Sequence, residues 1–176
     1  MDKNEIRKVM KKRRLLMERE TFLLHSQKII EKVQQHDSYK KAKTIGIYVS
    51  LPGEVDTIPL IQQALKTHRV CVPKVIKDEM EFYYIRSLND LKEGTFHVLE
   101  PITHELADAK DIDLMIVPML AFDNQNYRVG YGKGFYDKYF AKDYNGYKLG
   151  LAFLYQKVHQ IDIDIYDLPL DEILSE

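Results

Sequence analysis

The sequence predicts a single-domain α/β fold over residues 1–176, with three α/β/α layers, a mainly parallel central sheet and an N-terminal helical segment. Three observations predict it. Apolar runs of strand length alternate with segments of helical periodicity, which is typical of strands joined by crossover helices. One of these runs is apolar throughout, as in a strand that is buried on both faces. A chain of 176 residues usually makes one domain around one core.

The N-terminal part of the chain is predicted to be helical. Residues 3–36 contain no Gly or Pro, and their apolar side chains recur at spacings of three, four and seven. This pattern fits either one long helix or two helices in succession.

Strands and a helix are predicted in the next part of the chain. Residues 44–50 alternate between apolar and other side chains, which predicts a strand, and a Pro-Gly pair follows it. Asp56 and Thr57 can then cap a short helix that carries a proline in its first turn. Two further strands are predicted at residues 69–73 and 81–86.

The second half of the chain contains the predicted central strand. Residues 87–111 are polar and interrupted by Gly and Pro, so they stay unassigned. The continuous apolar run at residues 114–117 predicts a strand inside a parallel sheet. A helix through Phe140 and a strand at residues 149–154 complete the alternation. Ligands of such sheets usually bind beyond the carboxyl ends of the strands.

Composition and charge exclude several classes of protein. The net charge of −1 gives no overall attraction to nucleic acid or to anionic membranes, so neither is an expected partner. The single cysteine, Cys71, lies in an apolar run and is expected to be a small buried hydrophobic residue, which excludes a disulfide framework. No apolar stretch approaches the ~20 residues that span a bilayer, and no signal peptide is recognised. We expect a cytoplasmic monomer.

The most informative segment is a glycine-rich stretch with the residues Gly130-Tyr131-Gly132-Lys133-Gly134. Alternate glycines permit a close backbone approach, so that consecutive N–H groups can point at one anion. Arg128 and Lys133 supply full positive charges. Asp137 lies one helical turn after Lys133, where a carboxylate can hold Mg²⁺ against bound phosphates. The segment therefore predicts a site for a polyphosphate with a metal ion.

A plain glycine-rich turn with a solvated lysine is also compatible with this pattern. The two common nucleotide-binding motifs are absent. Gly134 follows Lys133 where the P-loop requires Ser or Thr, and the glycine spacing of the dinucleotide motif is not met, since Phe135 and Tyr136 follow Gly134.

The stretch from Asn126 to Asp137 resembles the signature of the 5-formyltetrahydrofolate cyclo-ligases, also called methenyltetrahydrofolate synthetases. Three further segments fit in the same order. They are the pair Lys3 and Arg7 on the basic helix, the stretch from Ile47 to Thr57, and Asp167 followed by residues 170–174. The resemblance covers nearly the whole chain.

The resemblance implies a ligase that forms a C–N bond with ATP as co-substrate and Mg²⁺ as cofactor. ATP would phosphorylate the formyl oxygen of 5-formyltetrahydrofolate, and the side-arm nitrogen of the folate would attack the formyl carbon. Loss of phosphate would leave 5,10-methenyltetrahydrofolate and ADP. The expected partners are therefore two small molecules, ATP and 5-formyltetrahydrofolate.

The resemblance also implies which residues make the site. The ATP contacts would be Lys3, Arg7, Arg128, Val129, Gly130, Tyr131, Gly132, Lys133, Gly134, Phe135 and Tyr136. The folate contacts would be Val49, Glu54, Tyr131, Gly132, Lys133, Gly134 and Phe135. Asp137 and Asp167 match the magnesium positions, and Lys133 and Arg128 would act in catalysis. Phe135 stands where a tyrosine is common, and Tyr131 where some members have arginine.

Two other functions remain open at this point. A sugar-phosphate isomerase-like α/β enzyme could use the loop for a single phosphate. A nucleic-acid or partner-binding protein could use the basic helix, whose other charged residues, Lys8, Lys11, Lys12, Arg13 and Arg14, are expected to form a solvated face. A neighbouring acidic residue could also replace Asp167 at the metal.

Overall fold

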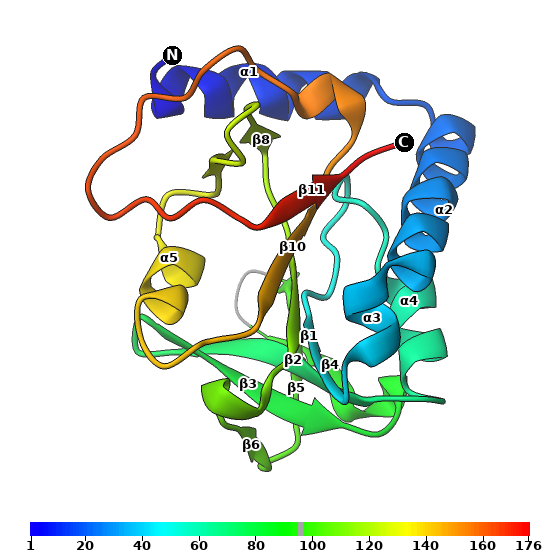
Figure 1. Cartoon of the computed structure of the whole chain (residues 1–176). Helices are drawn as coiled ribbons and strands as arrows, with labels where there is room; N and C mark the ends of the chain where they lie inside the picture. The colour runs from blue at the N-terminus through cyan, green and yellow to red at the C-terminus, as the bar shows by residue number, and fades with distance from the viewer. Residues whose placement is uncertain (95–96) are drawn as a thin grey trace.

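A seven-stranded sheet forms the centre of the fold in the computed structural model, which describes residues 1–94 and 97–176 (Figure 1). In spatial order its strands are β11 (Glu172–Leu174), β10 (Tyr147–Leu151), β7 (Leu114–Val117), β1 (Thr44–Ile47), β2 (Arg69–Ile76), β3 (Glu79–Ile85) and β6 (Leu106–Ala107). The first five run parallel, and β3 and β6 join antiparallel. The predicted mainly parallel sheet is confirmed, and the apolar run in β7 lies inside it between β10 and β1.

Helices cover both faces of this sheet. They are α1 (Lys3–Leu16), α2 (Arg19–Gln35), α3 (Asp37–Lys41), α4 (Ile58–Ala64) and α5 (Phe135–Phe140). The helices α2, α3 and α4 lie on one face and α5 on the other, whereas α1 crosses the end of the sheet at which the parallel strands finish (Figure 1). The carboxyl ends of β1 and β7 therefore face α1, which is where ligands of parallel sheets usually bind.

Short elements complete the chain. Two small antiparallel pairs join β4 (Leu91–Glu93) with β5 (Leu99–Pro101), and β8 (Ala121–Phe122) with β9 (Arg128–Val129). Short 3₁₀ helices cover Leu88–Asp90, Ala109–Asp111 and Leu154–Gln156.

The hydrophobic core has a layer on each face of the sheet. One contains the buried side chains of α2, α4, β1 and β7, including Ile29, Ile47 and Leu60. The other packs Tyr139 of α5 against Phe82 of β3 and includes Cys71, which is fully buried as predicted. Burial also raises the pKa of the Cys71 thiol, because the thiolate loses hydration.

The N-terminal segment forms two helices, the second of the two predicted alternatives, because Met17 and Glu18 have extended backbones. Other predicted boundaries are corrected by local hydrogen bonding. The first strand stops at Ile47 instead of residue 50. The Thr57 hydroxyl donates to the carbonyl oxygen of Tyr48 at 2.6 Å and accepts from the amide of Ser50 at 3.1 Å, so these backbone groups bond to a side chain rather than to a strand.

Strand lengths differ at two more places. The predicted strands at residues 69–73 and 81–86 are longer or displaced, because they form one hairpin around Lys77 and Asp78, which both have positive φ angles. The last predicted strand ends at Leu151 rather than residue 154. Beyond it the Phe153 amide donates to the Gln156 side chain at 2.7 Å, which starts a 3₁₀ turn.

No helix among the described residues combines the length and apolar character that would let it cross a membrane.

Candidate active site

The glycine-rich loop connects β9 to α5 at the end of the sheet that α1 covers. Gly132 and Gly134 have φ angles of +110° and +68°, a backbone region that residues with a Cβ rarely adopt. Gly134 is the N-cap of α5 in the left-handed conformation. The glycines at these two positions are therefore required by the path of the chain as well as by any close approach of a ligand.

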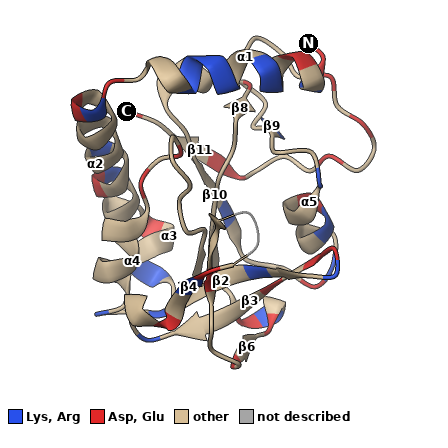
Figure 2. Ribbon diagram, turned by 180° about the vertical axis from the view of Figure 1, so that it is seen from behind, with Lys and Arg blue, Asp and Glu red and all other residues tan. Residues whose placement is uncertain are grey.

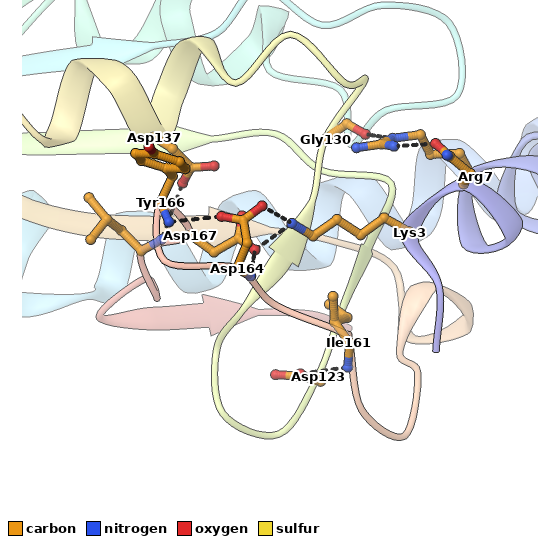
Figure 3. A network of polar contacts seen from close by, with 11 residues as sticks. Lys3, Arg7, Asp123, Gly130, Asp137, Ile161, Asp164, Tyr166 and Asp167 are labelled. Atoms are coloured by element: carbon orange, nitrogen blue, oxygen red, sulfur yellow. Dashed lines mark hydrogen bonds and ion pairs between the residues drawn. The ribbon is translucent and has the colours of Figure 1, made fainter.

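Helix α1 lies along this loop and carries three basic side chains on one face, of which Arg7 and Arg14 contact the loop and Lys3 contacts Asp164 and Asp167 in the C-terminal segment. Lys3, Arg7 and Arg14 follow one another at spacings of four and seven, which places them on one helix face. Arg7 Nε donates to the carbonyl oxygen of Gly130 at 2.9 Å, and Arg14 Nη1 donates to the Tyr131 hydroxyl at 3.0 Å (Figure 3 shows the Arg7 contact). Figure 2 shows Lys and Arg residues distributed along α1 at this end of the molecule.

Apolar side chains hold α1 in this position. Ile6 and Met10, which lie on the same side of the helix, are 2% exposed and pack against Leu120, Ala121 and Val129. Burying side chains of this size contributes about 1.5–3 kcal/mol each. This apolar contact holds α1 against β8 and β9, and so keeps Arg7 and Arg14 beside the loop.

Two aspartates, Asp137 and Asp167, form an acidic pair near Lys3 at the N-terminal end of α1. Lys3 Nζ bonds Asp167, whose side chain is 12% exposed, and reaches Asp164 at 3.5 Å (Figure 3). Asp137 in the first turn of α5 accepts a hydrogen bond of 3.5 Å from the amide of Leu168. Burial raises the pKa of Asp137, and the nearby charge of Asp167 raises it further, whereas Arg128 and Lys3 oppose the shift. The two predicted metal residues are therefore brought together.

Arg128 lies beneath the loop as a largely covered charge. Its Nη1 donates to the carbonyl oxygen of Pro118 at 3.1 Å, and its guanidinium carbon lies 5.1 Å from the centre of the Tyr136 ring. Its Nε is buried and has no hydrogen-bond acceptor in the described parts of the chain. Burial lowers the pKa of Arg128, while Asp137 acts in the opposite direction; the guanidinium keeps its charge at any ordinary pH.

Glu54 lies on the other side of the loop, in the segment that follows β1. It is only 5% exposed, and its carboxylate accepts hydrogen bonds from the amide of Leu51 at 2.7 Å and from the Tyr131 hydroxyl at 3.1 Å. Burial raises the pKa of Glu54, although these hydrogen bonds and the charge of Arg14 oppose the shift. Arg14, Tyr131 and Glu54 form one chain of polar contacts.

The remaining predicted residues differ in what they can contribute. Lys133 is exposed at the tip of the loop and bonds no other described residue. The side chains of Val49 and Val129 are buried in the core. These residues can therefore contribute to a ligand site only through backbone hydrogen bonds or by shaping its wall. Phe135 and Tyr136 are half-buried and pack against the core layer beneath α5.

Arg14 is the residue that the sequence analysis missed. Its assignment to a solvated helix face is wrong, because its side chain contacts Tyr131 and is packed against Gly53. A signal was present in the sequence: Arg14 lies seven residues after Arg7 and so occupies the same face of the helix.

Comparison with known proteins assigns the family. The model of the 5-formyltetrahydrofolate cyclo-ligase family matches residues 1–176. The chain belongs to this family. The 5-formyltetrahydrofolate cyclo-ligase of Mycoplasma pneumoniae is 34% identical and the alignment covers 100% of this chain and 99% of that protein. The mouse 5-formyltetrahydrofolate cyclo-ligase is 29% identical, with 99% and 93% covered.

Solved structures of the family have the same fold. The 5,10-methenyltetrahydrofolate synthetase of Aquifex aeolicus superposes with a TM-score of 0.88 at 34% identity, covering 97% of this chain and 88% of that one. The corresponding synthetase from Mycoplasma pneumoniae gives a TM-score of 0.82 at 29% identity, with 99% of each chain covered. Membership in the cyclo-ligase family confirms the predictions of family and of a ligase, and the roles of individual residues stay predictions.

Proposed function

We propose that this chain converts 5-formyltetrahydrofolate into 5,10-methenyltetrahydrofolate in a reaction that consumes ATP and requires Mg²⁺. The terminal phosphoryl group of ATP passes to the formyl oxygen, which gives ADP and turns a poor leaving group into a good one. The side-arm nitrogen then attacks the formyl carbon and gives up its proton to solvent, and the C–O bond breaks with release of inorganic phosphate.

The observation that carries this proposal is the position of the glycine loop between two different sets of groups. On one side are the acidic pair and Lys3, which suit a metal-bound polyphosphate. On the other side is the buried carboxylate of Glu54, linked to the loop through Tyr131. A loop in this position can contact a nucleotide and an acceptor together, which phosphoryl transfer requires.

Positive charge on the loop supports the transfer step. Lys133 is free to meet the phosphates at the exposed tip, while Arg128 holds a fixed charge beneath the loop. Phosphoryl transfer depends mainly on positioning and on stabilising the charge of the transition state, so it needs no protein nucleophile. Arg7 of α1 holds the loop in place through its hydrogen bond to the carbonyl oxygen of Gly130.

The buried carboxylate of Glu54 suits the folate. A pterin ring presents N–H groups along one edge, and a carboxylate can only accept hydrogen bonds. Leu51 and Tyr131 hold each oxygen of Glu54 in place, so an incoming pterin meets an acceptor whose position is already set.

The acidic pair fits Mg²⁺ as a partial ligand set. Magnesium is usually held by one or two carboxylates, with phosphate and water oxygens completing its shell, and Asp137 and Asp167 would supply the carboxylates. The described residues contain no group of three or more ligands that could hold a metal unaided, which agrees with a site completed by ATP. When bound, the ion would neutralise phosphate charge. Lys3 positions Asp167.

Turnover tests the proposed function directly. Purified protein with ATP, Mg²⁺ and 5-formyltetrahydrofolate is expected to form the methenyl product, followed by its near-ultraviolet absorbance, with one ADP per product. Omitting ATP or chelating the metal should abolish the signal. Product formation without ATP, or equal ATP hydrolysis with and without the formyl folate, would contradict the mechanism.

Asp137→Asn is expected to raise the Mg²⁺ concentration for half-maximal activity. Even loss of an outer-shell partner of a metal costs about 10- to 100-fold in affinity, so the loss of a direct carboxylate contact should cost at least as much. A magnesium titration of activity at saturating ATP measures it. Asp143→Asn, the same change beyond the other end of α5, serves as the control. An unchanged titration for Asp137→Asn places the metal elsewhere.

The alternative of a nucleic-acid or partner-binding protein has less support. Three basic residues of α1 are engaged by the loop and its neighbours, which leaves less of the helix for nucleic acid. The cytoplasmic location and the monomeric state stay predictions.

A further inference from the structure

Asp123 is a buried acidic residue that the proposed function leaves without a role. It begins the turn of residues 123–126 between β8 and β9, and it is only 2% exposed. Its Oδ1 accepts hydrogen bonds from the amides of Gln125 at 3.0 Å and Tyr127 at 3.2 Å, and its Oδ2 accepts one from the amide of Ile161 at 3.1 Å. One side chain therefore joins two segments that are far apart in the sequence (Figure 3).

The same turn also holds the other end of the segment that carries Asp167, which we call the acidic segment (residues 161–170). The amide of Leu170 donates to the carbonyl oxygen of Asn126 at 2.9 Å, and the side-chain amide of Asn126 donates to the carbonyl oxygen of Asp171 at 3.3 Å. Asn126 has a φ of +64°, which Asn adopts more readily than most residues other than Gly. Both ends of the acidic segment are thus anchored to one turn.

The turn leads directly into the glycine loop. The amide of Asp123 donates to the carbonyl oxygen of Tyr127 at 3.1 Å, and Arg128 follows as the first residue of β9. Glycine loop and acidic segment therefore leave the same turn in two directions. If the bond from Ile161 to Asp123 were lost, the acidic segment could shift relative to the loop.

The position of Asp167 depends on where the acidic segment starts. Ile161 is buried in the apolar cluster beneath α1 that includes Ile6. Three residues later the amide of Asp164 donates to Asp167 Oδ2 at 2.8 Å, and Lys3 bonds the same oxygen. The chain path that begins at Ile161 therefore sets the place at which this carboxylate lies.

We propose that Asp123 is a positioning residue for the metal site. By holding Ile161 it places Asp167 beside Asp137 and the glycine loop, and so it determines how well these carboxylates can hold Mg²⁺ with a nucleotide. Asn126 supports the other end of the acidic segment in the same way. The inference rests on the proposed function, because it takes Asp137 and Asp167 to be the magnesium residues. It adds a residue that acts on metal use from outside the site.

Asp123→Asn tests this role through nucleotide binding, without turnover. The substitution keeps the size of the side chain, but an amide nitrogen replaces one of the oxygens that accept backbone N–H groups. Loss of a group that orients a metal ligand costs about 10- to 100-fold in metal affinity. In calorimetry, the ratio of the ADP affinity with Mg²⁺ to that with EDTA should therefore fall by about tenfold or more. The ADP affinity with EDTA should change little.

Asp113→Asn is the matched control. Asp113 also accepts hydrogen bonds from two backbone amides, those of Lys43 at 2.9 Å and Thr44 at 3.0 Å, but at the opposite end of the sheet. This variant should keep the wild-type ratio. If Asp123 has only a structural role, Asp123→Asn weakens ADP binding equally with Mg²⁺ and with EDTA, and that unchanged ratio overturns the inference.

A double variant tests whether Asp123 acts through Asp167. In an Asp167→Asn background, Asp123→Asn should lower the ratio no further, because the carboxylate that it positions is already absent. Additive losses of the two substitutions would overturn the inference.

Asn126→Gly provides a milder variant. Gly keeps the positive φ of the turn, so only the side-chain bond to Asp171 is lost. The ratio of ADP affinities should fall in the same direction, by about two- to tenfold for one neutral hydrogen bond. If Asp123→Asn does not fold, a wild-type ratio in Asn126→Gly overturns the inference.

Hydrogen exchange of the ligand-free protein keeps this inference distinct from the proposed function. The amide of Asp164 should exchange about tenfold faster in Asp123→Asn than in the wild type, and at the wild-type rate in Asp113→Asn. Unchanged exchange of this amide in Asp123→Asn overturns the inference. Binding of ADP that is independent of Mg²⁺ in the wild type contradicts the proposed function, while the exchange rate still decides whether Asp123 holds the acidic segment.

Discussion

Lys133→Ala is expected to lower kcat/KM for ATP by about 10²- to 10³-fold, the usual effect of removing one preorganised donor from a transition state. The side chain is exposed in the glycine loop and has no partner among the described residues, so its charge is available to a phosphate. The free energy of unfolding of the variant should differ from that of the wild type by less than about 0.5 kcal/mol, as for surface substitutions in general. Steady-state kinetics and urea denaturation measure the two effects.

A matched lysine provides the control for this experiment. Lys142 is also exposed and lies just beyond the far end of α5, where it makes only a weak ion pair of 4.0 Å with Glu79. Lys142→Ala should leave the ATP kinetics unchanged. Wild-type ATP kinetics in Lys133→Ala, or a variant that no longer folds, would defeat the assignment of this lysine to the phosphates.

The parts of the fold that the sequence predicts are those governed by local periodicity. The apolar run of β7 lies in the interior of the sheet, where every one of its side chains is buried. The helices α1 and α2 follow from their apolar spacing. The missed elements depend on other signals: α3 begins with the ring of His36 accepting from the amide of Ser38, and His is an uncommon cap.

Turns and edge strands are also hard to predict, because they do not depend on local periodicity. The hairpin between β2 and β3 turns at Lys77-Asp78 with positive φ angles, although no glycine marks it. The three residues of β11 reach the sheet edge only because the chain returns to β10 from a distant position. Neither feature leaves a periodic pattern in the sequence.

The candidate site divides in a similar way. Its glycine loop can be recognised locally, and its nearby carboxylate at Asp137 follows by helical spacing. The contact of Arg14 with Tyr131 joins residues that are 117 positions apart, and it depends on α1 crossing the sheet. A basic helix viewed alone gives no reason to choose Arg14 over its neighbours, unless the face shared with Arg7 is considered.

Glu54→Gln is expected to raise the KM for 5-formyltetrahydrofolate by about 10²-fold while KM for ATP changes by less than about twofold, because the loss of a buried charged acceptor costs about 1.5–3 kcal/mol. The substitution keeps the shape of the side chain and an oxygen for the amide of Leu51, but it removes the negative charge that the pterin edge would meet. Glu31→Gln, on the exposed surface of α2, is the control.

The pH dependence of this variant provides a second measurement. Burial raises the pKa of Glu54 above its ordinary value of 4.5, so in the wild type kcat/KM for the folate should fall, as the pH is lowered, before a free carboxyl group would protonate. That acid limb should disappear in Glu54→Gln. The stability effect has the opposite sense: a carboxyl whose pKa is raised on folding stabilises the fold at low pH and loses this contribution as the pH rises through its pKa.

Glu54→Gln should therefore gain stability relative to the wild type as the pH rises, even while it binds folate less well. Urea denaturation of both proteins across the pH range, together with folate kinetics on the same preparations, separates the two effects. Equal losses for ATP and folate, or an acid limb that persists in the variant, would show that Glu54 acts on the loop as a whole rather than on the pterin.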